Sequence, residues 1–226
     1  MQPYLFPYIG YFQLLNAVDK FVVFDDVNFI KKGWINRNNI LVNRQKYLFT
    51  VPLKDASQNR LIKEIQIAEG DWQKKFLKTL SQSYKKAEFF DETFALIEKT
   101  VYSDESFIAK LILQNLLIFK DALKINTEIV TSSEIYNNCE LRAQYRILDI
   151  CKREKATEYV NPAGGMELYD RRFFDESGVK LFFLKTQPFS YRQFSDEFVP
   201  HLSIIDVLMF NGAAGTSELL SRYVLD

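Results

Sequence analysis

The feature that most constrains the fold is a four-residue apolar run, near the start of the chain, that ends in two carboxylates. Phe21–Phe24 are all apolar and β-forming, and the run is short enough for a strand buried on both faces of a parallel sheet. Asp25 and Asp26 follow directly. Because ligands of open α/β sheets bind outside the carboxyl ends of the strands, we expect chemistry at this strand exit.

The segment before this strand is an aromatic loop followed by a helix pattern. Pro3 and Pro7 hold the loop extended, since each proline fixes its own φ and disfavours helical geometry in the residue before it. Ile9 and Phe12 then begin an apolar repeat at helical spacing. We therefore predict a short amphipathic helix over residues 9–18.

Strand and helix patterns alternate along the rest of the chain. The further predicted strands are 40–42, 47–51, 65–67, 127–131, 159–160 and 181–184, the first two forming a hairpin. The further predicted helices are 71–84, 91–102, 103–123 with Ser103 as N-cap, 140–155, 202–208 and 217–224. This alternation predicts an α/β fold with a partly parallel, Rossmann-like sheet and a helical lobe at about residues 70–123.

Composition excludes several classes of protein. Lysine plus arginine equals aspartate plus glutamate at 29 each, so no overall field attracts the chain to nucleic acid. No segment approaches the ~18 uninterrupted apolar residues of a membrane span, and the N-terminus lacks a signal-peptide pattern, which predicts a cytoplasmic protein. Cys139 and Cys151 have neither CxxC spacing nor a histidine cluster near them, so no metal site is predicted. No phosphate-loop or dinucleotide motif occurs, and the sequence identifies no cofactor.

The predicted catalytic residues are Asp25, Asp26 and Arg37. Two adjacent acids at a strand end point to different sides, so one of them is expected to face a pocket. That carboxylate would accept a proton, bind a sugar hydroxyl or bind a metal; otherwise it caps a turn or pairs with a nearby cation. The planar fork of Arg37 suits a phosphate or a carboxylate.

Predicted substrate-binding residues come from four segments of the chain. The hydroxyls of Ser132 and Ser133 follow a strand and can bind phosphate, although ordinary helix caps have the same pattern. Asp206, inside an apolar run, is either a buried brace or a site residue, and the brace is favoured. The lone His201 is interpreted as a cap or surface residue. The full predicted set is Gln2, Tyr4, Tyr8, Gly10, Tyr11, Trp34, Asn36, Asn38, Ser132, Ser133, Asn161, Gly164 and Gly165.

Five strings in this order and at these intervals resemble the WbqC-like family of bacterial proteins over nearly the whole chain. The strings are MQPYLFPYIGYFQL, FDDVNFIKKGWINRN, TSSEIY, YVNPAGG and HLSIIDVL. The resemblance implies one WbqC-like domain over residues 1–226. Relatives usually carry a short apolar first strand before the MQP string, which here stands at the first residue, Met1.

The resemblance also implies a role in bacterial surface-polysaccharide (O-antigen) biosynthesis. The expected reaction is transfer of an acyl or aminoacyl group to a small-molecule substrate, a nucleotide-linked amino sugar. A non-catalytic module that binds a sugar nucleotide or glycan, or a partner of a transferase, is the alternative. Whether the chain forms an oligomer stays open.

A further alternative is an ATP-dependent activating enzyme that resembles the nucleotidylyltransferases. Residues 8–11 (YIGY) stand where that superfamily has a His-x-Gly-His motif, and residues 132–135 (SSEI) resemble its later phosphate motif. Both histidines are missing here, and those groups would stabilise charge on the phosphates. The departure counts against nucleotidyl transfer.

Overall fold

Two short parallel strands join the N-terminal segment to the middle of the chain. In the computed structural model, which describes all residues 1–226, β1 (Lys20–Val22) pairs in parallel with β6 (Glu128–Val130). The pairing continues past both strands, because the Ser133 amide donates to the Val23 carbonyl at 2.8 Å. Parallel strands end at the same edge, so the residues after β1 and those after β6 lie together.

The predicted alternation of strands and helices is present, with shorter elements at several places. The helices are α1 (Ile9–Asn16), α2 (Trp72–Tyr84), α3 (Phe90–Val101), α4 (Ile108–Ala122), α5 (Ala143–Arg153), α6 (Arg171–Asp175) and α7 (Ile204–Leu219). The remaining strands are β2 (Arg37–Val42), β3 (Gln45–Thr50), β4 (Leu53–Lys54), β5 (Gln66–Ile67), β7 (Glu158–Pro162), β8 (Lys180–Thr186) and β9 (Tyr223–Leu225). Three 3-10 turns are η1 (Ile62–Glu64), η2 (Ser133–Tyr136) and η3 (Ala163–Leu168).

The strands form four small sheets, and a Rossmann-like sheet is not confirmed. β7, β8 and β9 make one sheet, in which β7 and β8 are parallel, while β2–β3 and β4–β5 are antiparallel pairs. A cavity of about 390 Å³ separates β1 from β7 and is lined by both strands. Met1 lies beside β1 at this cavity, and its amino group donates to the Val22 carbonyl at 2.8 Å.

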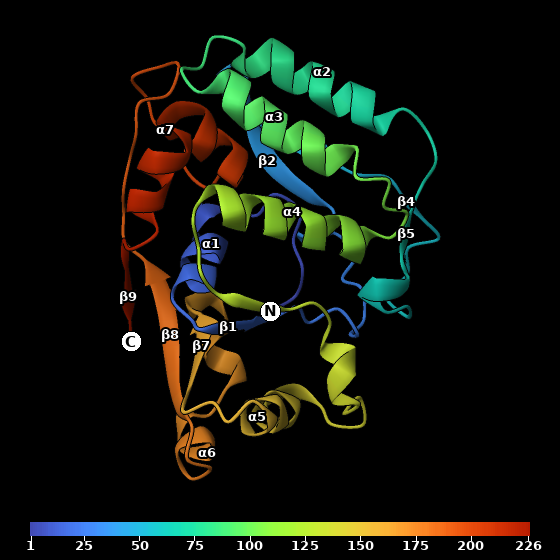
Figure 1. Ribbon diagram of the computed structural model, residues 1–226, viewed down its shortest axis with the longest axis vertical. Coiled ribbons are helices and arrows are strands. Elements are labelled where there is room, and N and C mark those ends of the chain that lie inside the picture. Colours follow the sequence, from blue (N-terminus) through green and yellow to red (C-terminus); the bar gives the residue numbers. More distant parts are fainter.

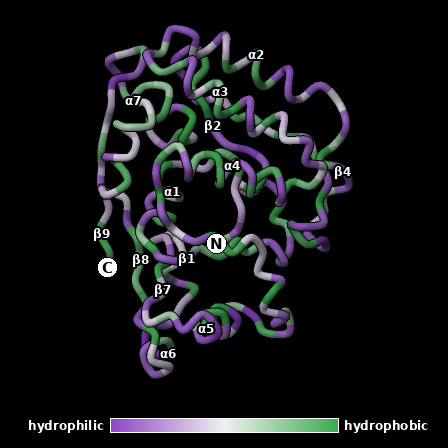
Figure 2. Tube along the Cα trace, in the orientation of Figure 1, coloured by the Kyte–Doolittle hydropathy of each residue, from purple (hydrophilic) through white to green (hydrophobic).

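Helices α2, α3 and α4, which fall within the lobe predicted over residues 70–123, follow one another from the top of the molecule to its middle in Figure 1. The buried face of α2 consists of Phe76, Leu77, Leu80 and Tyr84. Hydrophobic segments gather around α1 and α4 in the middle of the molecule (Figure 2). A core cluster of 41 buried residues joins these helices to the N-terminal loop, and a smaller cluster of 6 joins α5 and α6 to β8, with Tyr159 of β7 packed against it.

Two local predictions are wrong. Ser103 does not cap a helix, because α4 begins only at Ile108 and the Ser103 hydroxyl is buried without a partner. The predicted helix over residues 217–224 is replaced by the end of α7 and by β9, which pairs with the edge of β8. The open edge of β8 offers backbone hydrogen bonds to these residues, and a helix pattern read from neighbouring residues contains no information about that edge.

Asp206 is the predicted buried brace. Its side chain is 0% exposed and accepts hydrogen bonds from the Tyr84 hydroxyl at 2.8 Å, the Tyr191 hydroxyl at 2.6 Å and the Gln193 amide at 2.7 Å. These donors tie the loop after β8 to α2 and to the start of α7. None of the helices combines the length and the apolar character that a membrane span requires.

Candidate functional site

A cavity of about 1050 Å³ opens at the carboxyl end of β1. Its walls come from the N-terminal loop, the segments after β1 and β6, the first turn of α5, and η3 after β7. The cavity lies where the parallel strands β1 and β6 end side by side. The sequence predicts a site at this strand exit. Its size and its mixture of aromatic and charged walls suit a small-molecule substrate.

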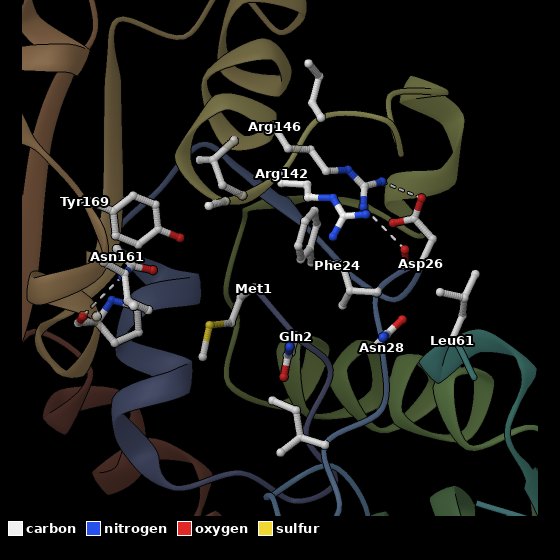
Figure 3. A pocket seen from close by; sticks show the side chains of 18 of the residues that line it. Met1, Gln2, Phe24, Asp26, Asn28, Leu61, Arg142, Arg146, Asn161 and Tyr169 are labelled. Carbon is white, nitrogen blue, oxygen red and sulfur yellow. Dashed lines mark hydrogen bonds and ion pairs between the residues drawn. The ribbon is translucent and has the colours of Figure 1, made fainter. Parts of the chain in front are cut away.

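The floor of the cavity holds a buried ion pair. The guanidinium of Arg146 donates to the Asp26 carboxylate at 2.5 Å and to the Asp26 carbonyl at 3.3 Å, and the two side chains are only 5% and 7% exposed (Figure 3). The guanidinium also lies over the Phe24 ring, 4.8 Å from its centroid. A pair withdrawn from water in this way is held by complementary hydrogen bonds, because the desolvation of both charges must be offset.

Further polar groups hold this pair in one geometry. The Arg146 Nε donates to the Asn138 side chain at 2.9 Å, and the Asn138 amide donates to Asp149 at 2.7 Å. The Ser133 hydroxyl donates a short hydrogen bond to the Asp26 carboxylate. Asp26 therefore has a cation on one oxygen and a hydroxyl on the other, which keeps its orientation towards the cavity unchanged.

Asp25 does not line the cavity, and its carboxylate is bound by a different serine. The Ser132 hydroxyl donates to the Asp25 carboxylate at 2.7 Å. Burial raises the pKa of Asp25 above its ordinary value, and the bond from Ser132 acts in the opposite direction. The predicted pair of acids and the predicted pair of serines are thus brought together, with only Asp26 on the cavity wall.

The opposite wall carries two phenols and an amide. Tyr159, Asn161 and Tyr169 line the cavity, and the Tyr159 hydroxyl lies 3.3 Å from the side-chain oxygen of Asn161 and 3.5 Å from the Tyr169 hydroxyl. Figure 3 shows Asn161 and Tyr169 across the open space from Asp26 and Arg146. Burial raises the pKa of Tyr159 well above its ordinary value, so this hydroxyl is a proton-bearing donor at neutral pH.

A second ion pair and an exposed arginine complete the wall nearest the mouth. Lys63 in η1 pairs with Glu134 in η2 at 2.5 Å. Arg142, directly before α5, makes no capping hydrogen bond and is exposed to the cavity. The first turn of α5 contains no acidic residue, so its amides and Arg142 present positive charge to the same space.

Eight predicted site residues line the cavity, and eight do not. Those on its wall are Gln2, Tyr4, Tyr8, Asp26, Trp34, Asn161, Gly164 and Gly165. Asp25, Ser132 and Ser133 lie behind the wall in the network just described. The other five, Gly10, Tyr11, Asn36, Arg37 and Asn38, are found in packing or backbone contacts.

The polar members of that last group bond to the protein backbone. The amide of Asn38 donates to the Phe6 carbonyl at 2.9 Å, and that of Asn36 donates to the Val51 carbonyl at 2.7 Å. Arg37 donates to the Gly33 carbonyl at 2.8 Å and to the carbonyl of Lys32, and it lies 5.9 Å from the centroid of Trp34. Arg37 therefore shapes the turn that presents Trp34 to the cavity.

Gly10 is required by close packing. A Cβ at this position would stand closer than 3.0 Å to the ring of Tyr8 and to the Thr186 hydroxyl. We expect Gly10→Ala to lower the free energy of unfolding by about 1–3 kcal/mol, the usual range for overpacking a filled site. Chemical denaturation measures this loss, and Gly164→Ala is the matched control because no atom lies within 4 Å of a Cβ there. Equal stability of the two variants would contradict the packing role.

Sequence reasoning missed Arg146, Arg142, Lys63 and the two cavity tyrosines. Arg146 stands four residues before Ile150, and both are buried on the same face of α5. That spacing was the available signal. The structure contains no group of three or more histidine, cysteine, aspartate or glutamate side chains that could hold a metal ion.

Comparison with known proteins places the chain in a family. The family model of the WbqC-like proteins matches residues 2–218. The chain belongs to the WbqC-like family. One relative, "Uncharacterized protein Rv1507c" of Mycobacterium tuberculosis (strain ATCC 25618 / H37Rv), is 29% identical over 220 residues, which span 96% of this chain and 94% of the relative. No solved structure matches this WbqC-like chain.

Proposed function

We propose that this WbqC-like protein is an enzyme of bacterial surface-polysaccharide biosynthesis that transfers an acyl or aminoacyl group to a nucleotide-linked amino sugar. The observation that supports it best is the Asp26–Arg146 pair on the floor of the large cavity, held rigid by Ser133 and Asn138. Asp26 is the group that would orient, and accept a proton from, an amino or hydroxyl group of the acceptor. The substrate class rests on the family.

The mouth of the cavity suits the anionic part of such a substrate. Arg142 and the uncapped first turn of α5 offer positive charge, and Tyr4, Tyr8 and Trp34 offer aromatic faces on the same cavity. A diphosphate would bind the cations, while the aromatic faces would stack on a base or a sugar. Tyr159 and Asn161 would hydrogen-bond sugar hydroxyls on the other wall.

A non-catalytic sugar-nucleotide or glycan-binding module is the second candidate. It is favoured by one specific observation, which is that both acids on the wall already have cationic partners: Asp26 pairs with Arg146 and Glu134 pairs with Lys63. A paired carboxylate is a weaker base than a free one. Binding of the sugar nucleotide without any product would support this candidate.

The activating-enzyme alternative receives less support from the site. The hydroxyls of Ser132 and Ser133 donate hydrogen bonds to Asp25 and Asp26, so these protons are not free to bind a phosphate. Tyr8 and Tyr11 occupy the positions of the histidines in the superfamily motif, and the Tyr11 hydroxyl donates to the Gln2 carbonyl at 3.0 Å. A stabilising effect of ATP alone would revive this alternative.

Ligand-dependent thermal stability tests the proposed function. The purified protein is screened against nucleotide-linked amino sugars, ATP, CTP, acyl-CoA and glycine. A ligand at a hundred times its dissociation constant should add about 2.7 kcal/mol of apparent stability. Arg142→Gln should remove most of the shift caused by a nucleotide sugar, whereas Arg172→Gln, at an exposed position on α6, should leave it unchanged.

Mass spectrometry then decides between the two candidates. Incubation of the stabilising sugar nucleotide with acyl and aminoacyl donors should give a product heavier by the transferred group. In the thermal stability screen, stabilisation by a nucleotide sugar that Arg142→Gln does not reduce would reject this cavity as the nucleotide site. No shift with any sugar nucleotide would reject the proposed substrate class.

A further inference from the structure

Most of the charged side chains on the wall of the large cavity are already paired. Those that line the cavity are Asp26, Lys63, Glu134, Arg142 and Arg146. Two ion pairs take up four of them, and Arg142 takes part in none of the ion pairs of the structure. The diphosphate of a nucleotide-linked sugar is charged on each of its phosphates, so this single unpaired arginine does not balance it.

No general positive field around the opening makes up the difference. Glu140, Glu167 and Asp170 are exposed, and each stands next to a residue that lines the cavity. These acids repel an anion at the mouth, while the exposed Lys31 and Lys32 attract it, so the two effects oppose each other. A second cation for the substrate is therefore to be sought among the side chains inside the cavity.

The two ion pairs of the wall differ in how firmly they are held. The side chains of Arg146 and Asp26 are 5% and 7% exposed, and further hydrogen bonds fix both of them. The Lys63 ammonium has Glu134 as its one ion-pair partner, and the Glu134 side chain is 65% exposed. An exposed ion pair adds little to stability, so Glu134 can leave Lys63 easily, whereas separating Arg146 from Asp26 would leave a buried charge unpaired.

The backbones that carry Lys63 and Glu134 are both fixed by hydrogen bonds. The Lys63 amide donates to the Asp25 carbonyl at 3.0 Å, which places η1 at the exit of β1. The Glu134 amide donates to the Ser132 hydroxyl oxygen at 3.2 Å, and the Glu134 carbonyl accepts from the Asn137 amide at 2.9 Å. Release of Lys63 therefore requires only a rotation of the exposed Glu134 side chain.

We propose that the Glu134 carboxylate occupies the position of a substrate phosphate on Lys63, and that the diphosphate of the nucleotide-linked substrate exchanges with it and binds Lys63 and Arg142. Carboxylate and phosphate oxygens accept the same charge-assisted hydrogen bond from an ammonium. Glu134 and Arg142 stand on one segment that runs from η2 to the start of α5 along the cavity wall. Figure 3 shows Arg142 and Leu61, which directly precedes η1, beside the same open space. The inference rests on the proposed function, since it names the groups that bind the substrate's diphosphate.

The exchange makes the cavity selective for a phosphorylated ligand. The hydrogen bond to Glu134 raises the pKa of Lys63 against the opposite effect of burial, and the charges of Asp26 and Asp25 add to the increase. The amine therefore stays protonated after Glu134 has left. A neutral glycan offers Lys63 no negative charge, so it leaves the ion pair intact and gains nothing from this cation.

Binding of inorganic pyrophosphate tests the exchange without a sugar, a nucleotide or turnover. Isothermal titration calorimetry measures the dissociation constant for the wild type, Glu134→Gln, Lys63→Gln and the double variant. Lys63→Gln should weaken binding about tenfold, the effect of losing one charge-assisted hydrogen bond. Glu134→Gln should strengthen binding about threefold more when Lys63 is present than in the Lys63→Gln background, because only then does it remove an ion pair that pyrophosphate has to break.

Glu176→Gln is the matched control, because it changes the net charge equally and breaks an exposed ion pair with Arg172 on α6, away from the cavity. It should leave pyrophosphate binding unchanged. Equal effects of Glu134→Gln in both backgrounds would overturn the exchange, and so would binding that Lys63→Gln does not weaken. Absence of pyrophosphate binding to both the wild type and Glu134→Gln would reject the diphosphate site on Lys63. The proposed function is measured separately, by the stabilisation with a nucleotide sugar, so the two can fail independently.

Discussion

Replacement of Arg146 by alanine is expected to lower the free energy of unfolding by about 3–5 kcal/mol. The substitution removes the cation from a buried pair and leaves the Asp26 carboxylate, 7% exposed, without a counter-charge. It also removes the donor that Asn138 accepts at 2.9 Å and the guanidinium that covers Phe24. Equilibrium denaturation in urea or guanidinium measures the loss.

A surface arginine on the same helix is the matched control. Arg153 pairs with Asp149 at 2.8 Å, but its side chain is 50% exposed, so Arg153→Ala should cost less than about 1 kcal/mol. Adding Asp26→Asn to Arg146→Ala should recover part of the stability, since the uncompensated charge is then gone. A cost below about 1 kcal/mol for Arg146→Ala would show that the pair does not hold the floor of the cavity.

Asp206→Ala is expected to lower the free energy of unfolding by about 3 kcal/mol or more. Three donors, from Tyr84, Tyr191 and Gln193, would lose their common acceptor in a site that water does not reach. Each unsatisfied buried donor costs about 1–3 kcal/mol, and removal of the buried carboxyl offsets part of the sum. Asp121→Ala, at an exposed position on α4, is the control and should stay within about 0.5 kcal/mol of the wild type.

The pH dependence of the same site gives an independent check. Burial raises the pKa of Asp206 above its ordinary value of 3.8. The native state therefore binds more protons than the unfolded state between these two pKa values, so this contribution to stability is full below about pH 3.8 and is lost as the pH rises through the raised pKa. Asp206→Asn has no such contribution. The stability difference between wild type and Asp206→Asn should shrink from pH 4 towards neutral pH, and a constant difference would contradict burial as the cause.

Several parts of the fold could be predicted because the information is local. The apolar repeat of α2, the hairpin of β2 and β3, and the strand that precedes Asp25 each follow from side chains within a few residues of one another. The end of the chain shows the limit of such reasoning. Tyr223–Leu225 form a strand only because the edge of β8 is available to pair with them.

The candidate site was predicted in part for the same reason. Asp26 and Ser133 each follow a predicted parallel strand, so their proximity follows from topology. Arg146 comes from a helix 120 residues after Asp26, and nothing near it in the chain indicates its partner. Arg37 was predicted to bind a phosphate or a carboxylate because of its planar fork, whereas its Nε and one terminal nitrogen donate to carbonyls of its own turn.

The amino-acid sequence by itself determined the family, the alternation of strands and helices, and the strand exit at Asp25 and Asp26, because short-range patterns and strings carry that information. Only the tertiary structure decided which of the two acids faces the cavity, which cation neutralises it, and which candidates became braces. Those outcomes depend on burial and on distances between segments far apart in the chain. Hydrogen bonds and ion pairs form there according to position in space, whatever the separation in sequence.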